Sequence, residues 1–244
     1  MANVSLGSEG FRKYAVGSGV VMQTTHEQSR FEVAAWTGGP QQLTADATHF
    51  GYVQEGTCDL EGNAGRFPLR QGMYFSLPGS GTLRGAGSGV VISEHGVRGL
   101  FQLGGPVEKQ GRLHYIDGCS DTLLLSPVVR GDACLNLLVI PPHTHQTAHT
   151  HPSFRAGIIA AGAGLCRLSS QDVPLEAGDL FVIEPDTLHS FHTEASSLTV
   201  IAFHPDSDFG PHRDDHPMVN RTIVDGVAAS QLSLAQRRIG GHAS

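Results

Sequence analysis

Histidine is concentrated in one part of this chain. The sequence has 244 residues and 14 histidines. Imidazole changes its charge near neutral pH and is the commonest side-chain ligand for transition metals. This concentration indicates that the second half of the chain has a use for imidazole. Nine of the 14 lie in one window, at positions 143, 145, 149, 151, 189, 192, 204, 212 and 216.

His149 and His151 have the spacing of two ligands on one face of a strand. Alternate side chains of a strand point to the same side, so both imidazoles could reach a single divalent metal. A third ligand must come from another strand. His189 follows a later apolar strand, and an antiparallel return of that strand would bring it beside the pair. The spacing predicts a metal site formed by His149, His151 and His189.

Arg155 has the same strand parity as this pair. In a regular strand its guanidinium would face the same cavity, where it would bind an anion beside the metal. Arginine holds carboxylates through two parallel hydrogen bonds, so we expect Arg155 to be both a catalytic and a substrate-binding residue. The alternative is a bulge at Pro152 that turns Arg155 outward, towards a surface carboxylate.

The remaining histidines have less specific positions. His143 and His145 share the parity of the metal pair but follow two prolines, which places them at the mouth of the pocket. His145 is included as a candidate substrate-binding residue. His192 has the opposite parity to His189 and is expected on the surface, while His204 and the histidines after it require no metal.

Two segments of the chain repeat at an offset of 106 residues. Residues 51–56 and 157–162 each begin and end with glycine, and the Pro-Leu-x-x-Gly of residues 68–72 recurs at 174–178. Phe75 and Phe181 match at the same offset. The repeat predicts two copies of one β unit, joined near residues 104–106. The positions in the first copy that correspond to the three histidines are Leu43, Ala45 and Thr82, so this copy is expected to hold no metal.

The composition predicts an all-β fold. The chain contains 31 glycines and 13 prolines in short clusters, which is typical of short strands joined by turns. We expect two tandem barrels of the jelly-roll type followed by a tail. The predicted boundaries are 1–104 for an N-terminal barrel without metal, 105–206 for a metal-binding barrel, and 207–244 for the tail. A short helix is expected over 227–239.

The histidine motifs resemble those of the cupin superfamily. The run from His149 to Gly162 is similar to the first cupin motif, and the run from Gly178 to His189 is similar to the second. The resemblance implies a bicupin built from two double-stranded β-helix barrels. Arg155 stands where the family has its ligating glutamate, and arginine offers only donors. The implied ligand set is three histidines, as in the thiol and β-diketone dioxygenases. The second motif also departs at Thr187 and Thr193, where glycine and asparagine are usual.

The resemblance leaves several functions open. The favoured hypothesis is a non-haem Fe(II) dioxygenase that binds one metal per chain and acts on a small anion, namely a carboxylate, enolate or phenolate, together with O2. One alternative is a non-redox metalloenzyme (a hydrolase, isomerase or decarboxylase), and the bicupin ureidoglycine aminohydrolase is an architectural relative with a different ligand set. Another is a cupin that only binds a small ligand. Imidazole ligands also suit Mn, Ni, Zn and Cu.

Charge and cysteine content exclude other classes. The chain has 16 Lys and Arg against 23 Asp and Glu, a formal charge of -7, which does not favour nucleic acid or anionic membranes. No apolar stretch approaches the ~20 residues of a membrane span. Four scattered cysteines and an N-terminus without an apolar core favour the cytoplasm. The tail has too few apolar residues to fold alone, so it is expected to pack on a barrel or on a second subunit of a homodimer.

Overall fold

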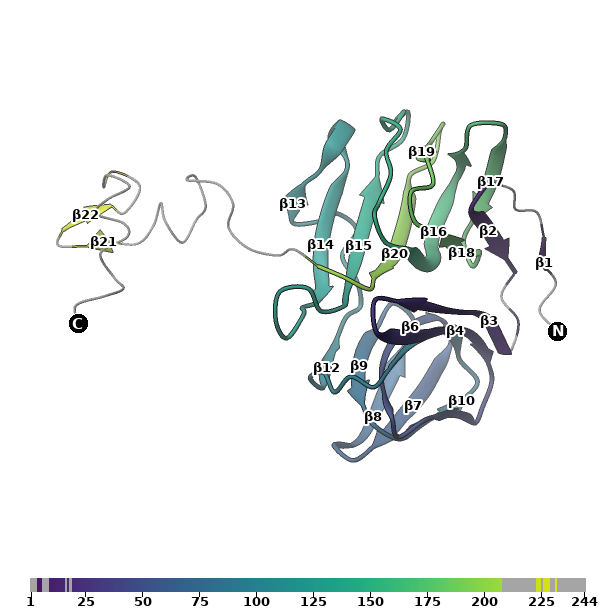
Figure 1. Ribbon diagram of the computed structural model, residues 1–244, viewed down its shortest axis with the longest axis vertical. Helices are drawn as coiled ribbons and strands as arrows, with labels where there is room; N and C mark the ends of the chain where they lie inside the picture. The colour runs from purple at the N-terminus through teal and green to yellow at the C-terminus, as the bar shows by residue number, and fades with distance from the viewer. Residues whose placement is uncertain are drawn as a thin grey trace. The chain divides into compact units, whose positions relative to one another are not determined.

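The computed structural model describes residues 4–5, 9–15, 17, 19–207, 223–224, 226–228 and 231. The chain divides into two compact units, Met1–Ser207 and Asp208–Ser244. The first unit is all-β and contains two barrels, drawn in purple to blue and in teal to green in Figure 1. The predicted fold class, tandem barrels of the jelly-roll type, is confirmed.

The first barrel is made of two antiparallel sheets. One has six strands in the order β12-β9-β6-β11-β4-β3, and the other has four in the order β5-β10-β7-β8. The strands are β3 (Gly19–His26), β4 (Ser29–Thr37), β5 (Gln41–Leu43), β6 (Ala47–Glu55), β7 (Thr57–Gly62), β8 (Gly65–Arg70), β9 (Tyr74–Pro78), β10 (Gly81–Gly85), β11 (Ser88–His95) and β12 (Gln102–Gly104).

The second barrel is built around a ten-stranded sheet. Its main path is β1-β2-β18-β16-β20-β15-β14-β13, and β17 and β19 pair with the long, bent strand β16. The strands are β1 (Val4–Ser5), β2 (Phe11–Tyr14), β13 (Leu113–His114), β14 (Ser120–Leu125), β15 (Cys134–Ile140), β16 (Arg155–Arg167), β17 (Asp172–Glu176), β18 (Leu180–Ile183), β19 (Ser190–His192) and β20 (Leu198–His204).

The glycines of the sequence repeat perform the same task in both barrels. Gly56 and Gly162, 106 positions apart, have φ of 71° and 79°. Gly72 and Gly178 have φ of 83° and 94°. These values lie in the left-handed region, where a Cβ is costly, so the turns require glycine. The repeat therefore reflects two turns that each barrel needs at the same place.

The N-terminal strand belongs to the second barrel. β2 pairs with β18, with Phe11 opposite Ile183 and Tyr14 opposite Leu180. Figure 1 shows β2 beside the second barrel, before the chain enters the first. The expectation that all of residues 1–104 form the first barrel is therefore corrected at its beginning. The sequence between residues 5 and 19 has no pattern that predicts this long-range pairing.

Three apolar clusters hold this unit together. One lies between the two barrels and combines Phe31 and Ile92 from the first with Leu137 and Phe203 from the second. The other two fill the individual barrels. Trp36, Leu60 and Leu83 belong to the first interior, whereas Ile159 and Phe181 belong to the second. Because both barrels contribute to the shared cluster, they pack as one unit.

The second unit is described only in part. Its described residues form β21 (Ile223–Val224) and β22 (Val227–Ala228), an antiparallel pair. Gly226, with φ of 81°, supports the tight turn between them. The helix predicted over 227–239 is thus wrong at residues 227–228, and its remaining positions lie almost entirely outside the described residues. The described part of the chain has no helix with the length and apolarity that a membrane crossing requires.

Candidate metal centre

Two histidines are joined through their backbones. His149 and His189 form an isolated antiparallel bridge. The N–H of His149 donates to the carbonyl of His189 at 2.9 Å, and the N–H of His189 donates back at 3.0 Å. Residues paired in this way project their side chains to the same side of the ribbon. The two rings accordingly lie with centroids 4.6 Å apart.

His151 completes a group of three. Its ring centroid is 5.0 Å from that of His149 and 5.2 Å from that of His189. One nitrogen from each of the three rings lies within 4.8 Å of the others. The structure thus brings the three predicted ligands together. The regular strand predicted for them is absent, because the chain bends at Pro152 and Ser153 before β16 begins.

The backbone orients two of these rings. Nδ1 of His149 donates to the carbonyl of Thr147 at 2.8 Å. Nδ1 of His189 donates to the carbonyl of Thr187 at 2.8 Å. A proton on Nδ1 leaves Nε2 with a free lone pair, and metal-binding histidines ordinarily have such a partner on the other nitrogen. Both rings are therefore held in the tautomer that a metal requires.

The charge state of the group also fits a metal. Burial, followed by the charge of Arg155, lowers the pKa of His151 to about 3. Burial lowers the pKa of His189 to about 4, against an opposing hydrogen bond to Thr187. Both rings are neutral at pH 7. Metal–nitrogen bonds of about 2.1 Å require ligand atoms roughly 3–3.4 Å apart, so small ring rotations would close the site.

Arg155 is buried at the start of β16. It pairs with Ile183 across the sheet, and its side chain is 10% exposed. Nη1 donates to the carbonyl of Phe154 at 2.9 Å and to Oδ1 of Asp206 at 3.2 Å. It also bonds to the hydroxyl of Ser153. The guanidinium therefore pairs with a carboxylate, as expected for an Arg155 that is turned outward. Its side chain nevertheless faces the inside of the barrel.

One edge of this guanidinium is free. Nε of Arg155 is buried and has no hydrogen-bond partner. Buried polar groups normally have one, so this N–H is available to donate to a bound molecule. Arg155 lies close enough to lower the pKa of His151, His189 and His204 by its charge. The unpaired edge is thus a cationic contact next to the three histidines.

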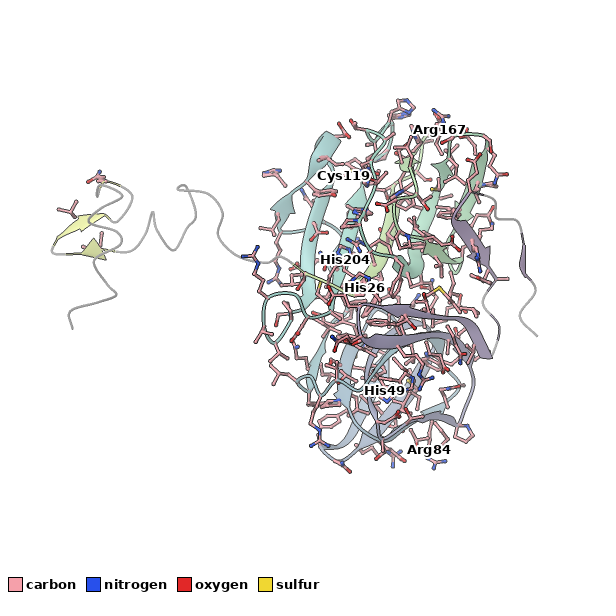
Figure 2. The ribbon with its side chains drawn as sticks, viewed as in Figure 1. His26, His49, Arg84, Cys119, Arg167 and His204 are labelled. Atoms are coloured by element: carbon pink, nitrogen blue, oxygen red, sulfur yellow. The ribbon has the colours of Figure 1, made fainter. Side chains whose placement is uncertain are left out.

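His204 is a fourth histidine at this end of the barrel. Its ring centroid is 6.4 Å from that of His151, and burial holds its pKa well below the usual range. The sequence motifs predict no role for it. The alternation along β20 could have found it, because Leu198 and Val200 face the barrel interior and His204 has the same parity. Figure 2 shows His204 in the second barrel, with His49 inside the first.

His145 lies in a different pair. Its Nδ1 is 3.1 Å from Nδ1 of His192, whose Nε2 is 2.8 Å from the hydroxyl of Ser190. His145 is bridged to His192 just as His149 is bridged to His189. The two bridges are four positions apart on the segment from His145 to His149 but only three positions apart on the segment from His189 to His192. The ribbon therefore contains a bulge. His145 therefore contacts His192 and is outside the three-histidine group, and His192 is buried, not on the surface.

The first barrel has different side chains at the corresponding places. Leu43 is buried in its apolar interior. His49, which corresponds to Arg155, contacts Ser93 Oγ through Nδ1 at 2.8 Å and the Thr44 carbonyl through Nε2 at 2.9 Å. Both ring nitrogens are thus engaged within the protein. Among the residues that the structure describes, only one group of three or more His, Cys, Asp or Glu side chains has the spacing of a metal site. It consists of His149, His151 and His189.

One family model matches part of the chain, and several solved structures have a similar fold. The family described as the AraC-like ligand binding domain matches residues 128–233. Among solved structures, the protein Ylba from E. coli is 15% identical with a TM-score of 0.58, covering 85% of this chain and 96% of that one. A cupin 2 conserved barrel domain protein from Leptotrichia buccalis is 11% identical with a TM-score of 0.58, covering 77% and 89%.

A dioxygenase is among the structural neighbours. Salicylate 1,2-dioxygenase from Pseudaminobacter salicylatoxidans is 12% identical with a TM-score of 0.56, covering 72% of this chain and 70% of that one. No curated protein matches the sequence. At these identities the neighbours show the fold.

Proposed function

We propose that this chain is a metal-dependent bicupin enzyme, a non-haem Fe(II) dioxygenase that acts on a small organic anion. The observation that carries the proposal is the combination of three clustered imidazoles with one buried cation. His149, His151 and His189 present nitrogens to a common point, and the unpaired edge of Arg155 lies beside them. Three protein ligands leave coordination positions open for other molecules.

Each residue has a defined part in this proposal. When bound, a ferrous ion supplies the electron chemistry that allows O2 to react with an organic anion. His149 and His189 hold the site rigid, since their backbones are bonded to each other and their Nδ1 protons to carbonyls. Arg155 binds and orients the anion, and Asp206 and Ser153 fix the direction of its guanidinium.

Two observations support dioxygenase chemistry over other metal chemistry. The ligand set has no carboxylate, since Arg155 occupies the position of the usual glutamate. The structural neighbours include salicylate 1,2-dioxygenase, an enzyme named for an anionic substrate and for O2 chemistry. A non-redox enzyme that uses its metal as a Lewis acid would need the same ligands, so oxygen consumption decides between the two.

A second candidate is a ligand-binding protein without catalysis. The specific observation in its favour is the match to the AraC-like ligand binding domain over residues 128–233, which includes all three histidines and Arg155. In this case the metal and Arg155 would together bind a small anion, and no product would form.

The deciding experiment measures O2 uptake with the full chain. Protein purified without oxygen is stripped by a chelator and reloaded with Fe(II) or Zn(II), and a panel of small aromatic and aliphatic acids is added. The dioxygenase requires that Fe(II) restore substrate-dependent O2 uptake and that Zn(II) not do so. Turnover at an unchanged rate without O2 would establish the non-redox enzyme, and binding without any turnover would establish the ligand-binding protein.

A further inference from the structure

Two of the three grouped histidines share a sequence pattern. A threonine stands two residues before each of them, Thr147 before His149 and Thr187 before His189. In both cases the threonine carbonyl accepts the proton on Nδ1 of the histidine at 2.8 Å. The direction of each carbonyl therefore sets the rotation of one ring. Any contact that holds these two threonines in place also helps to position the two histidines.

Thr187 is held by packing. It is buried, and it lies so close to Gly10 that a Cβ at that glycine would clash with the threonine hydroxyl. The carbonyl of Gly10 in turn accepts the N–H of Glu184 at 2.7 Å. Thr187 is therefore enclosed between its own segment and the chain that leads into β2.

Thr147 has no such enclosure. It is exposed and lies in the bulge between the bridges of His145 and His149. The N–H groups of Gln146 and His149 donate across the ribbon. Among the described residues, no backbone bond across the ribbon reaches the two positions between them. A bulge ordinarily leaves its extra residue without a partner in the ladder. The carbonyl that holds His149 thus belongs to a residue that the ribbon itself does not fix.

Asp117 supports this residue from another part of the fold. Its Oδ2 accepts the N–H of Thr147 at 2.6 Å, and its Oδ1 accepts the proton of the Thr147 hydroxyl at 3.2 Å. Asp117 lies between β13 and β14, 30 positions earlier in the chain. Its carboxylate holds Thr147 through both oxygens, while the carbonyl of Thr147 holds His149.

The turn around Asp117 is anchored in the second barrel. The short 3-10 helix η1 (Ile116–Gly118) contains Asp117 with φ of 55° and ψ of 33°. This left-handed conformation is uncommon for residues other than glycine, asparagine and aspartate. The N–H of Tyr115 donates to the carbonyl of Cys119 at 2.9 Å, which closes the turn. Cys119 is buried in the interior of the second barrel, so the carboxylate of Asp117 projects from a fixed base.

We propose that Asp117 is a positioning residue of the metal centre, which orients the ring of His149 by fixing Thr147. The inference rests on the proposed function for the metal, and it adds to that site a residue from outside the histidine segment. The two hydrogen bonds carry the effect, and the negative charge alone does not. Loss of the carboxylate frees Thr147 and allows the ring of His149 to rotate before a metal binds.

The test replaces Asp117 by glycine, which adopts a positive φ without steric cost and lacks the carboxylate. The Zn(II) affinity of the full chain is measured by competition with a chromophoric chelator, and Co(II) absorption spectra report the geometry of the bound ion. Loss of a residue behind a metal ligand costs roughly 10- to 100-fold in affinity, and Asp117 acts through Thr147, so we expect about 10-fold for Asp117→Gly. The Co(II) spectrum should change as well. Asp117→Asn should bind close to the wild type, because its amide can accept the N–H and donate to the hydroxyl.

Glu27→Gly is the matched control. Glu27 is an exposed acidic residue with φ of 50°, in the turn between β3 and β4 of the first barrel. The change removes the same charge from the same backbone conformation, and it should leave Zn(II) binding unaltered. Equal weakening in Glu27→Gly and Asp117→Gly would overturn the proposal. Equal weakening in Asp117→Asn and Asp117→Gly would also overturn it, because charge would then be the cause.

NMR spectra of the histidine rings in the metal-free chain provide a readout that needs no metal. In the wild type, His149 should carry its proton on Nδ1, and its signals are assigned by their loss in His149→Gln. Asp117→Gly should move part of the His149 population to the Nε2–H tautomer and leave His189 unchanged, because Thr187 has its own support. Unchanged His149 signals would overturn the role of Asp117. A chain that shows this shift but binds no Zn(II) would overturn the metal centre itself, so the two failures are distinguishable.

Discussion

His149 and His189 are bonded to each other through both of their backbone groups, at 2.9 and 3.0 Å. This pairing fixes the positions of two rings whose residues are 40 positions apart in the sequence. A side chain anchored by the backbone on both sides loses little freedom when a metal binds. The site is therefore organised before any metal arrives, and its loss should be a local event that leaves the barrel folded.

The first prediction concerns metal content. His149→Ala and His189→Ala should each abolish binding of the one metal expected per chain, because two histidines cannot hold it tightly. Elemental analysis of protein purified without oxygen measures this directly. His145→Ala is the matched control, since His145 is an exposed histidine of the same segment, and it should retain full metal content.

His49→Ala tests the first barrel. Both nitrogens of His49 bond within the protein, so this variant should lose stability but no metal. Two metals per wild-type chain, or loss of metal in His145→Ala, would contradict the assignment of the site to His149, His151 and His189.

The second prediction concerns Arg155 and its hydrogen bond to Asp206. Arg155→Ala should retain the metal and lower kcat/KM for an anionic substrate by roughly 10- to 150-fold, the value of one charge-assisted contact. Asp206→Asn should have a smaller effect, because Nη1 keeps its bonds to Ser153 and to the Phe154 carbonyl. Steady-state kinetics across both variants measures this order. Unchanged kinetics in Arg155→Ala would show that the guanidinium does not contact substrate.

The third prediction concerns stability against pH. Glu94 is 6% exposed, and burial raises its pKa from 4.5 to about 7. Its charged form is therefore favoured in the unfolded chain, and the contribution of Glu94 to the free energy of unfolding should fall as the pH rises from 4.5 to 7. At 1.36 kcal/mol per pKa unit, the loss is up to about 3 kcal/mol.

Glu94→Gln should remove this loss, so that the variant exceeds the wild type in stability at pH 8 but not at pH 4.5. Urea unfolding at several pH values measures the difference. Asp121, whose pKa burial raises to about 6, acts in the same direction, whereas the lowered pKa values of His151 and His189 act in the opposite direction. These contributions are common to the wild type and the variant, so the difference between the two curves reports Glu94. The exposed Glu55→Gln is the control and should follow the wild type. Parallel curves for the wild type and Glu94→Gln would refute the prediction.

The fourth prediction concerns β2, the N-terminal strand that belongs to the second barrel. Phe11 of β2 is fully buried, with 0% exposure, and stacks near Phe181 with centroids 6.3 Å apart. Phe11→Ala should lower the free energy of unfolding by about 3–5 kcal/mol. Arg12→Ala, at the exposed neighbouring position, should change it by less than about 1 kcal/mol. Calorimetric melting of both variants measures this, and an equal loss in the two would contradict the burial of β2.

The three-histidine group could be predicted from the sequence because its signal is local. His149 and His151 are two residues apart, and the repeat placed His189 after the returning strand. The shared strand parity predicted for His145 and the pair His149 and His151 is not kept, for a physical reason. The parity argument assumes a regular ribbon, and a one-residue bulge between residues 145 and 149 reverses the face of His145. No residue type in that segment marks the bulge.

Long-range partners were beyond reach of the sequence. Asp206, which pairs with Arg155, is 51 residues away and was assigned to the boundary of the tail. Asp121 is a single acidic residue in a strand. It accepts a hydrogen bond from Asn136 only because β14 and β15 are adjacent. The pairing of β2 with β18 has the same cause. These contacts follow from the order of strands in the sheet, which local patterns do not encode.

The attachment of β2 to β18 has a consequence for how the chain assembles. β2 is synthesised about 170 residues before its partner β18, and the whole first barrel is made between the two. Until they dock, β18 presents an open sheet edge, and such an edge accepts any suitable strand. A neighbouring chain carries the same β2, so exchange of this arm between two copies is a ready route to a swapped dimer. Protein concentration during refolding would then set the ratio of monomer to exchanged dimer.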